Sequence, residues 1–219
     1  MSFSDHIIVI GRQCGSGGRE IGRKLAESLG IPYYDRRLLK TAAEELGIRA
    51  DLLEQHDERR PSCLTAWLAS TCGAQHASYS GTPFTDIGVQ RAQHKVLYDI
   101  MHKGPCVIVG RGADYIGRDL PNVVSLFLHA PLPYRIESMR RGEAKDMNTS
   151  EISELIERTD RRRAKYYRDF TGRRWGHSDN YHLSIDTSVA DSDTVVDIIR
   201  SFLKGLDPQK TVINQQSII

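Results

Sequence analysis

Residues 11–20, with the sequence GRQCGSGGRE, combine glycines and arginines in a pattern suited to binding phosphate. Glycines at positions 11, 15, 17 and 18 allow the backbone to turn sharply and direct its N–H groups inward. Apolar residues at positions 21, 25 and 29 predict a helix that begins directly after this loop. The positive end of that helix dipole would face the loop and favour an anion there. The segment therefore predicts a phosphate-binding loop.

This loop lacks the cation that such loops usually carry. The pattern GxxxxGK[ST] places Lys and a hydroxyl residue after its last glycine, whereas this chain has Gly18 and Arg19 there. Phosphoryl transfer depends on positive charge over the transferring group, so losing the cation without replacement would be costly. Arg12 and Arg19 are the two substitutes that the loop segment offers. The alternative interpretation is a glycine-rich turn flanked by surface arginines.

A second group of basic residues lies between positions 158 and 174, where the only acidic residues are Asp160 and Asp169. Arginines that close over phosphate groups neutralise developing charge and exclude water. The alternative is a solvated helix face. The formal charge of the whole chain is only +2, so we do not expect nucleic-acid binding.

The length, cysteine pattern and hydropathy of the chain favour a single domain in an intracellular protein. A chain of 219 residues suits one α/β domain with a full core. Its four cysteines form no CxxC pair and show no zinc-ligand spacing, which favours a reducing compartment. The first residues, MSFSD, lack the features of a signal peptide, and no apolar run approaches the ~20 residues of a membrane span. We therefore expect a cytoplasmic protein without membrane contact.

Short apolar strands alternate with amphipathic helices along the chain. Strands are predicted at residues 7–10, 31–35, 106–109, 123–128 and 182–185, and helices at 19–30, 38–46, 86–102, 132–141, from 149 onward, and around 195–202. This alternation predicts a parallel sheet covered on both faces, with ligands outside the carboxyl ends of the strands. The polar residues that follow the strands are expected at that edge: Arg12, Asp35, Arg111, Asp114 and Asp186.

Together these segments resemble the cytidylate-kinase-like family of P-loop nucleoside monophosphate kinases. The resemblance rests on IGRQCGSGGREIGRKLAESLGIPYYD, VIVGRGADYIG, the DxxRxxYY segment and LSIDT, and it extends over residues 5–203. It implies a five-stranded parallel sheet of order 2-3-1-4-5 in a single domain (1–205). It also implies a nucleotide-monophosphate-binding insert at about 36–90, an Arg-rich lid at about 142–176, and ATP with Mg2+ as donor. Residues 206–219 are expected to form a flexible tail.

The resemblance also assigns roles residue by residue. The donor phosphates would lie against Gly15, Ser16, Gly17, Gly18, Arg19 and Glu20. The acceptor would be bound by Asp35, Arg111, Asp114 and Asp160, although one residue more separates Arg111 from Asp114 than the family pattern has. The catalytic cations would be drawn from Arg12, Arg19, Arg158 and Arg163. The magnesium ligands are left open.

We therefore expect an ATP-dependent phosphotransferase whose substrates are nucleotides, with CMP or dCMP as the first choice of acceptor. Because the Lys is missing, a nucleotide-binding regulatory module with little or no kinase activity is the main alternative. Nucleic-acid binding through residues 158–174 is the less favoured third. The region 50–86 is where acceptor choice or a homodimer contact would lie.

Overall fold

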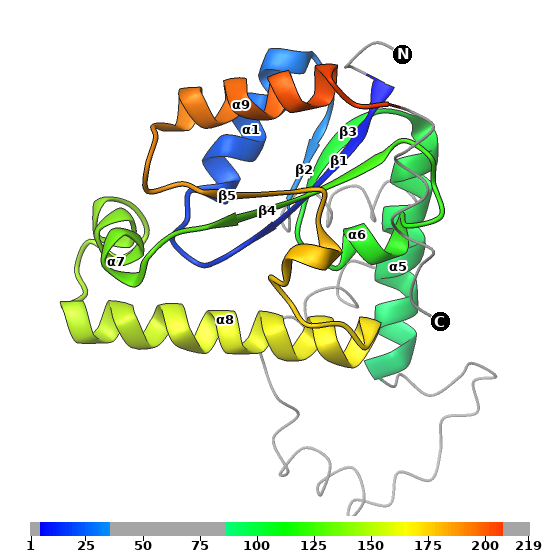
Figure 1. Cartoon of the computed structure of the whole chain (residues 1–219). Coiled ribbons are helices and arrows are strands. Elements are labelled where there is room, and N and C mark those ends of the chain that lie inside the picture. The colour runs from blue at the N-terminus through cyan, green and yellow to red at the C-terminus, as the bar shows by residue number, and fades with distance from the viewer. Residues whose placement is uncertain (1–4, 36–85, 208–219) are drawn as a thin grey trace, which may run out of the picture.

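A computed structural model of the chain describes residues 5–35 and 86–207, with side chains at 5–35 and 94–207. In this part of the chain a five-stranded parallel sheet is flanked by helices (Figure 1). The strands are β1 (Ile7–Arg12), β2 (Tyr33–Tyr34), β3 (Cys106–Val109), β4 (Val123–His129) and β5 (Leu183–Asp186). The helices are α1 (Gly18–Leu29), α5 (Asp86–Lys103), α6 (Ala113–Ile116), α7 (Leu132–Arg141), α8 (Thr149–Thr171) and α9 (Ser192–Lys204), with a 3-10 turn at Ser178–Asn180.

The strand order is β2-β3-β1-β4-β5, which confirms the order 2-3-1-4-5 and the P-loop fold class. The central strand β1 pairs in parallel with both neighbours, so that Ile7 lies opposite Cys106 of β3 and Val123 of β4. Strand β4 pairs in turn with β5, where Leu126 lies opposite Leu183. Every strand therefore ends at the same edge of the sheet, where polar residues were expected to gather.

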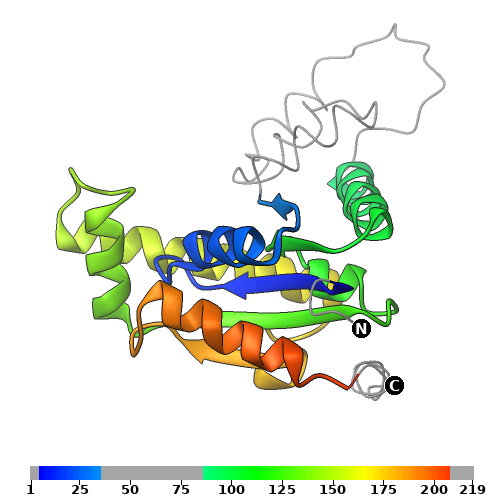
Figure 2. The same ribbon diagram turned by 90° about the horizontal axis from the view of Figure 1, so that it is seen from above.

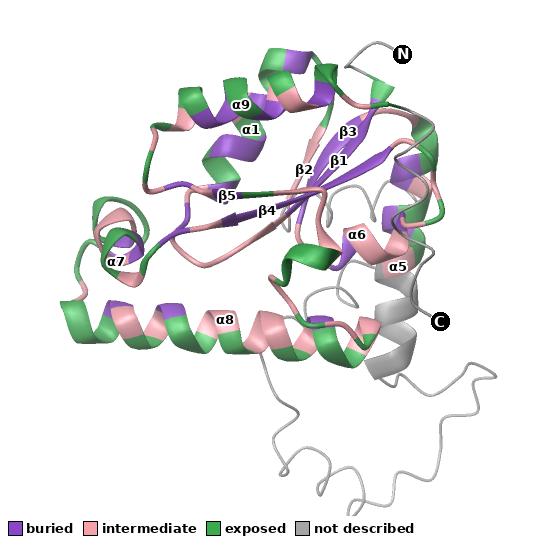
Figure 3. Ribbon diagram, viewed as in Figure 1, coloured by how far each residue is buried: buried purple, intermediate pink, exposed green. Residues whose placement is uncertain are grey.

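Successive residues of β1 face opposite sides of the sheet and bury two separate apolar layers. Ile8 and Ile10 pack with residues of α1 and α9, which contact each other on one face. Ile7 and Val9 pack with residues of α5 on the other face. Figure 2 shows α5 lying apart from the α1–α9 pair, and Figure 3 shows the inner strands β1, β3 and β4 mainly buried, whereas the edge strands β2 and β5 are more exposed. This two-layer core holds the carboxyl ends of the strands at fixed positions.

Helix α8 begins at a capping box and crosses the carboxyl ends of β1 and β3. Asn148 accepts a hydrogen bond from the backbone N–H of Glu151, and Glu151 accepts one from the N–H of Asn148. The first half of α8 packs against α7 through Ile152 and Ile156. Its second half supplies Arg163 to the end of β1 and Tyr167 to the loop after β3. The Arg-rich segment therefore lies directly over the predicted site.

The element boundaries differ in detail from those expected from the sequence. Strand β1 continues through Arg12, and β2 is confined to Tyr33–Tyr34 instead of 31–35. Strand β5 begins one residue late, at Leu183, although the backbone N–H of His182 already donates to the carbonyl of Ser125 on β4. Helix α6 was not predicted, since four residues are too few to show a helical period.

Several expectations fall outside the described residues. These are the helix at 38–46, most of the insert at 36–90, and the tail from residue 208. The division into a core, an insert and a lid within 1–205 stays a prediction. Among the described helices, none combines the length and apolar character that a membrane span requires.

Candidate active site

The loop between β1 and α1 is fixed from both sides. Gly15 and Gly17 adopt left-handed backbone angles, with φ of 79° and 74°. A Cβ at Gly15 would lie 2.7 Å from the backbone oxygen of Arg135, so α7 approaches the loop too closely for any other residue. The buried hydroxyl of Ser16 donates to the carbonyl of Gln13 at 2.9 Å. Among the described residues no side chain caps the N-terminus of α1, which leaves its first N–H groups to face a ligand.

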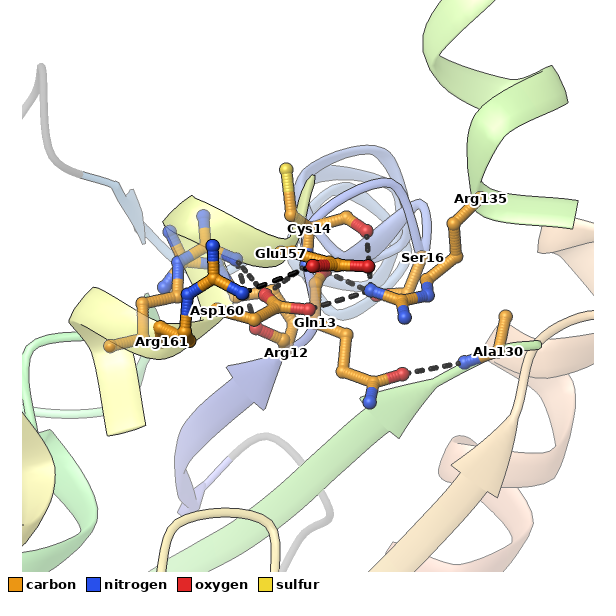
Figure 4. Close-up of polar contacts among 10 residues, drawn as sticks. Arg12, Gln13, Cys14, Ser16, Ala130, Arg135, Glu157, Asp160 and Arg161 are labelled. Atoms are coloured by element: carbon orange, nitrogen blue, oxygen red, sulfur yellow. Dashed lines mark hydrogen bonds and ion pairs between the residues drawn. The ribbon is translucent and has the colours of Figure 1, made fainter. Parts of the chain in front are cut away.

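The carboxylate of Asp160 joins α8 to this loop. It accepts a hydrogen bond from the backbone N–H of Cys14 at 2.8 Å and one from Arg135 at 2.6 Å (Figure 4). Arg135 also donates to the carbonyl of Cys14 at 3.3 Å. The helix, the loop and α7 therefore meet at one charged pair.

Three of the predicted arginines line a single pocket at the carboxyl edge of the sheet. They come from different elements: Arg12 from the end of β1, Arg111 from the loop after β3, and Arg163 from α8. Asp114 lines the same pocket. Arg163 lies 3.6 Å from Asp160 and also donates to the carbonyl of Arg12 at 3.1 Å. The sheet topology thus gathers positive charge where the substrate of an α/β fold would bind.

The loop after β3 has an unusual backbone. Gly110, Arg111 and Gly112 all have positive φ, at 90°, 67° and 63°. A positive φ is costly for an arginine, and residues held in such conformations cluster at functional sites. The two flanking glycines make this path possible and set the position of the Arg111 side chain.

The charges in the pocket disfavour one another. Burial, together with the neighbouring charges of Arg163, Arg19 and Arg111, lowers the pKa of Arg12 to about 9. Burial also lowers the pKa of Arg163, although Asp160 partly offsets this. A partly buried group of like charges is stabilised when an anion enters it. The pocket is therefore suited to phosphate.

Aromatic side chains line the same pocket as these arginines. The hydroxyl of Tyr167 donates to Asp114 at 2.6 Å, and burial raises the pKa of both groups. Tyr166, Trp175 and Tyr181 line the pocket beside them. A nucleobase could stack on such a surface, although Trp175 already packs edge-on against Phe127 in the sheet.

The remaining predicted residues lie around the pocket instead of lining it. Arg19 pairs with Glu143 at 2.5 Å, and Glu20 accepts from Ser192 at 3.0 Å, so both side chains are engaged with residues outside the loop. Arg158 is exposed on α8. Asp186 accepts from the hydroxyl of Ser188 within its own turn. Asp35 follows the short edge strand β2 and is partly exposed.

Sequence reasoning missed three residues that shape the site. Arg135 holds Asp160, Gln13 accepts from the backbone N–H of Ala130 at 3.1 Å, and Tyr181 lines the pocket. Gln13 lies within the glycine-rich loop, so its position in the sequence could have indicated a role in the site. Arg135 and Tyr181 are brought to the site by long-range packing, which no local pattern signals.

The comparisons with known proteins agree with this geometry. Residues 7–189 match the model of the cytidylate kinase-like family. The chain belongs to that family. A cytidylate kinase from Methanopyrus kandleri is 24% identical over 212 residues, which cover 92% of this chain and 93% of that protein. A cytidylate kinase from Methanosarcina barkeri is 23% identical over 124 residues, covering 57% and 67%.

Solved structures support the fold. An uncharacterized protein from Eubacterium ventriosum has a TM-score of 0.68 at 24% identity, covering 92% of this chain and 99% of its own. A shikimate kinase from Bacteroides thetaiotaomicron has a TM-score of 0.51 at 12% identity, covering 91% and 98%. At these identities the structural likeness shows a shared fold alone, and the family match indicates a kinase.

Proposed function

We propose that this protein is an ATP-dependent phosphotransferase that moves the γ-phosphoryl group of ATP to a nucleoside monophosphate, with CMP or dCMP as the preferred acceptor. The observation that carries the proposal is the convergence of Arg12, Arg111 and Arg163 on one pocket beside a glycine-rich loop. Like charges gathered in this way favour the binding of an anion, and the phosphate chains of two nucleotides would supply it.

The donor side of the site is the loop and the first turn of α1. The backbone N–H groups of Gly15, Ser16 and Gly17 would surround the β-phosphate, and those of Gly18, Arg19 and Glu20 would extend the cradle. This assignment uses the backbone of Arg19 and Glu20, because their side chains turn toward Glu143 and Ser192.

The acceptor side is the loop after β3. Arg111 would bind the acceptor phosphate through both arms of its guanidinium group, a geometry that Lys cannot provide. Asp114, held by Tyr167, would keep that loop in place, and Asp35 would accept hydrogen bonds from the nucleoside. No general base is needed, since a phosphate acceptor is already an anionic nucleophile.

The lid is the segment 142–176, built around α8. Arg163 would neutralise charge on the transferring phosphoryl group, and Arg158 would join it from the exposed face of the helix. Asp160 would hold the lid against the loop, because its carboxylate accepts hydrogen bonds from Cys14 and Arg135. Its role toward the acceptor is therefore indirect.

Magnesium would enter with the nucleotide. The described residues contain no group of three or more His, Cys, Asp or Glu side chains that could hold a metal ion. Kinases of this general type hold Mg2+ largely through substrate phosphates and one or two carboxylates, which needs no such cage. When bound, the ion would neutralise part of the negative charge on the donor phosphates.

An assay of ADP release tests the proposal directly. Mg-ATP is mixed with CMP, dCMP, UMP, AMP and GMP in turn, and we expect turnover to be highest with CMP or dCMP. ATP alone and shikimate, a non-nucleotide acceptor of the same fold class, serve as controls. Absence of turnover with every nucleotide acceptor would reject the proposal.

One observation favours a second candidate, a nucleotide-binding module without transfer activity. Asp160 places a carboxylate on the N–H of Cys14, inside the loop that would receive phosphate. Calorimetry separates the two candidates, because a regulatory module binds ATP or CMP but forms no product.

A further inference from the structure

We propose that Arg12 has taken over the work of the missing P-loop lysine, in an exchange of charge between positions 12 and 18. The inference rests on the proposed function and names the residue that supplies the donor-phosphate cation. In the pattern GxxxxGK[ST], counted back from Gly17, the first glycine falls at position 12 and the lysine at position 18. This chain has Arg12 and Gly18. The cation has moved from the helix to the strand.

The two positions exclude each other sterically. A Cβ at Gly18 would lie 2.8 Å from the Cβ of Arg12 and 2.9 Å from its Cγ. These contacts involve the stem of the arginine side chain, which cannot move as freely as its tip. A lysine at position 18 therefore cannot coexist with Arg12 in its present conformation. Gly18 is required because Arg12 occupies the space that a lysine stem would need.

The far end of the Arg12 side chain reaches the acceptor loop. A Cβ at Gly110 would collide with Nη1 of Arg12 and lie 3.0 Å from its Cζ. The side chain thus runs from the first turn of α1, beside the donor loop, to the loop that carries Arg111. With the proposed donor site at the loop and the proposed acceptor site at Arg111, the guanidinium group would lie between the two phosphates, where charge develops during transfer.

The surroundings of Arg12 favour an anionic ligand. Among the described residues, the charges that act most strongly on it belong to Arg163, Arg19 and Arg111, all of its own sign. Arg163 bonds the backbone carbonyl of Arg12 at 3.1 Å, so the lid helix also fixes the position of this residue. A partly buried cation held among other cations is costly in the free protein and favourable once phosphate is bound.

Arg19 is the alternative, and its geometry is less suited. Its guanidinium group pairs with Glu143, and its side chain is about half exposed, with a relative accessibility of 44%. A cation in the first turn of α1 also opposes the helix dipole. Arg19 would have to leave Glu143 to reach the loop, whereas Arg12 already lines the pocket.

The test combines nucleotide binding and turnover in a set of matched variants. Affinity for Mg-ATP and for inorganic tripolyphosphate is measured by calorimetry, and kcat/KM by ADP release with CMP. For Arg12→Ala we expect a Kd for both phosphate ligands that rises by roughly 10-fold or more. We expect kcat/KM to fall by about 10²- to 10³-fold. Arg12→Lys should retain part of the affinity for phosphate ligands and part of kcat/KM. Arg23 lies on the exposed side of α1, so Arg23→Ala serves as the control and should behave like wild type.

The exchange itself is tested by a rescue. In Arg12→Gly/Gly18→Lys the whole side chain of Arg12 is gone, including the Cβ that would lie 2.8 Å from a Cβ at position 18, and a lysine stands at its usual place, so affinity and turnover should recover at least 10-fold over Arg12→Gly. Gly18→Lys alone should be worse than wild type, because Arg12 remains in the way. The melting temperature of the nucleotide-free Arg12→Ala protein should be no lower than that of wild type. A merely structural role for Arg12 would lower it.

The outcomes separate this inference from the proposed function. If wild type binds ATP but transfers no phosphoryl group, the proposed function fails and the binding measurements still decide the role of Arg12. The inference is overturned if Arg12→Ala keeps wild-type affinity for ATP and tripolyphosphate, if Arg19→Ala loses more than Arg12→Ala, or if wild type binds neither ligand.

Discussion

Asp160 and Cys14 join helix α8 to the loop between β1 and α1, through a hydrogen bond of 2.8 Å from the backbone N–H of Cys14 to the carboxylate. Arg135 donates to the same carboxylate at 2.6 Å, and both side chains of this pair are largely buried. We expect Asp160→Asn to lower the free energy of unfolding by about 2–4 kcal/mol, because Arg135 keeps its charge without a partner. Urea unfolding measures it.

The matched control for this variant is Glu157→Gln. Glu157 pairs with Arg161 one turn earlier on the same helix, but both side chains are exposed. Exposed pairs contribute roughly 0–1 kcal/mol, so this variant should unfold close to wild type. Equal unfolding curves for the two variants would contradict the structural role of Asp160.

Two glycines of similar backbone conformation test how closely the phosphate loop is packed. Gly15 and Gly30 have φ of 79° and 65°, but a Cβ would meet Arg135 at Gly15 and nothing within 4 Å at Gly30. Gly30→Ala should cost about 1–2 kcal/mol, the cost of a left-handed conformation alone. Gly15→Ala should cost more and also weaken ATP binding. Parallel unfolding and calorimetry check this, and an equal loss in both variants would be the contrary result.

Arg111 should control the acceptor and not the donor. We expect Arg111→Lys to raise the KM for CMP by roughly 10-fold or more, because one ammonium group cannot bind the acceptor phosphate through two parallel hydrogen bonds. The Kd for ATP, measured without CMP, should change little. Initial rates at varied CMP give the first value and calorimetry the second. A rise in the Kd for ATP with an unchanged KM for CMP would contradict this assignment, because it would indicate that Arg111 binds the donor.

Stability should fall in mildly acidic solution, in part because of His182. The ring Nδ1 of His182 accepts the backbone N–H of Ser125 at 2.9 Å, and burial lowers its pKa below the ordinary 6.5. The unfolded chain therefore takes up this proton more readily, so the free energy of unfolding decreases as pH falls below 6.5. The loss levels off below the folded-state pKa.

Replacing His182 by Gln should remove part of this dependence, while His6 and His94, whose pKa values burial also lowers, retain theirs. Urea unfolding between pH 5 and 8 makes the comparison. Identical slopes for wild type and His182→Gln would show that this histidine is not the titrating group.

Elements long enough to show a hydrophobic periodicity could be predicted from the sequence. The helix α7 was predicted with its observed bounds, and the sheet order followed from the family resemblance and was confirmed. Short elements were less legible. Strand β2 has only two residues, and helix α6 only four, so neither is long enough to show a pattern.

Residues of the candidate site could be predicted from the sequence where they directly follow a predicted strand. Arg12 and Arg111 were expected at the carboxyl edge, and both line the pocket. The contacts of a side chain depend on neighbours distant in sequence, which is why it could not be predicted that Arg12 lines the pocket whereas Arg19 pairs with Glu143. Glu143, which holds Arg19, lies 124 residues away along the chain.

The most direct test of the central claim follows the phosphoryl group itself. ATP labelled at its γ-phosphate is incubated with the protein, Mg2+ and CMP, and the products are separated. We predict that label appears in CDP, and that Arg111→Ala reduces its rate of appearance. Label found only in inorganic phosphate, or remaining in ATP with CMP and with every other nucleoside monophosphate, would contradict the account.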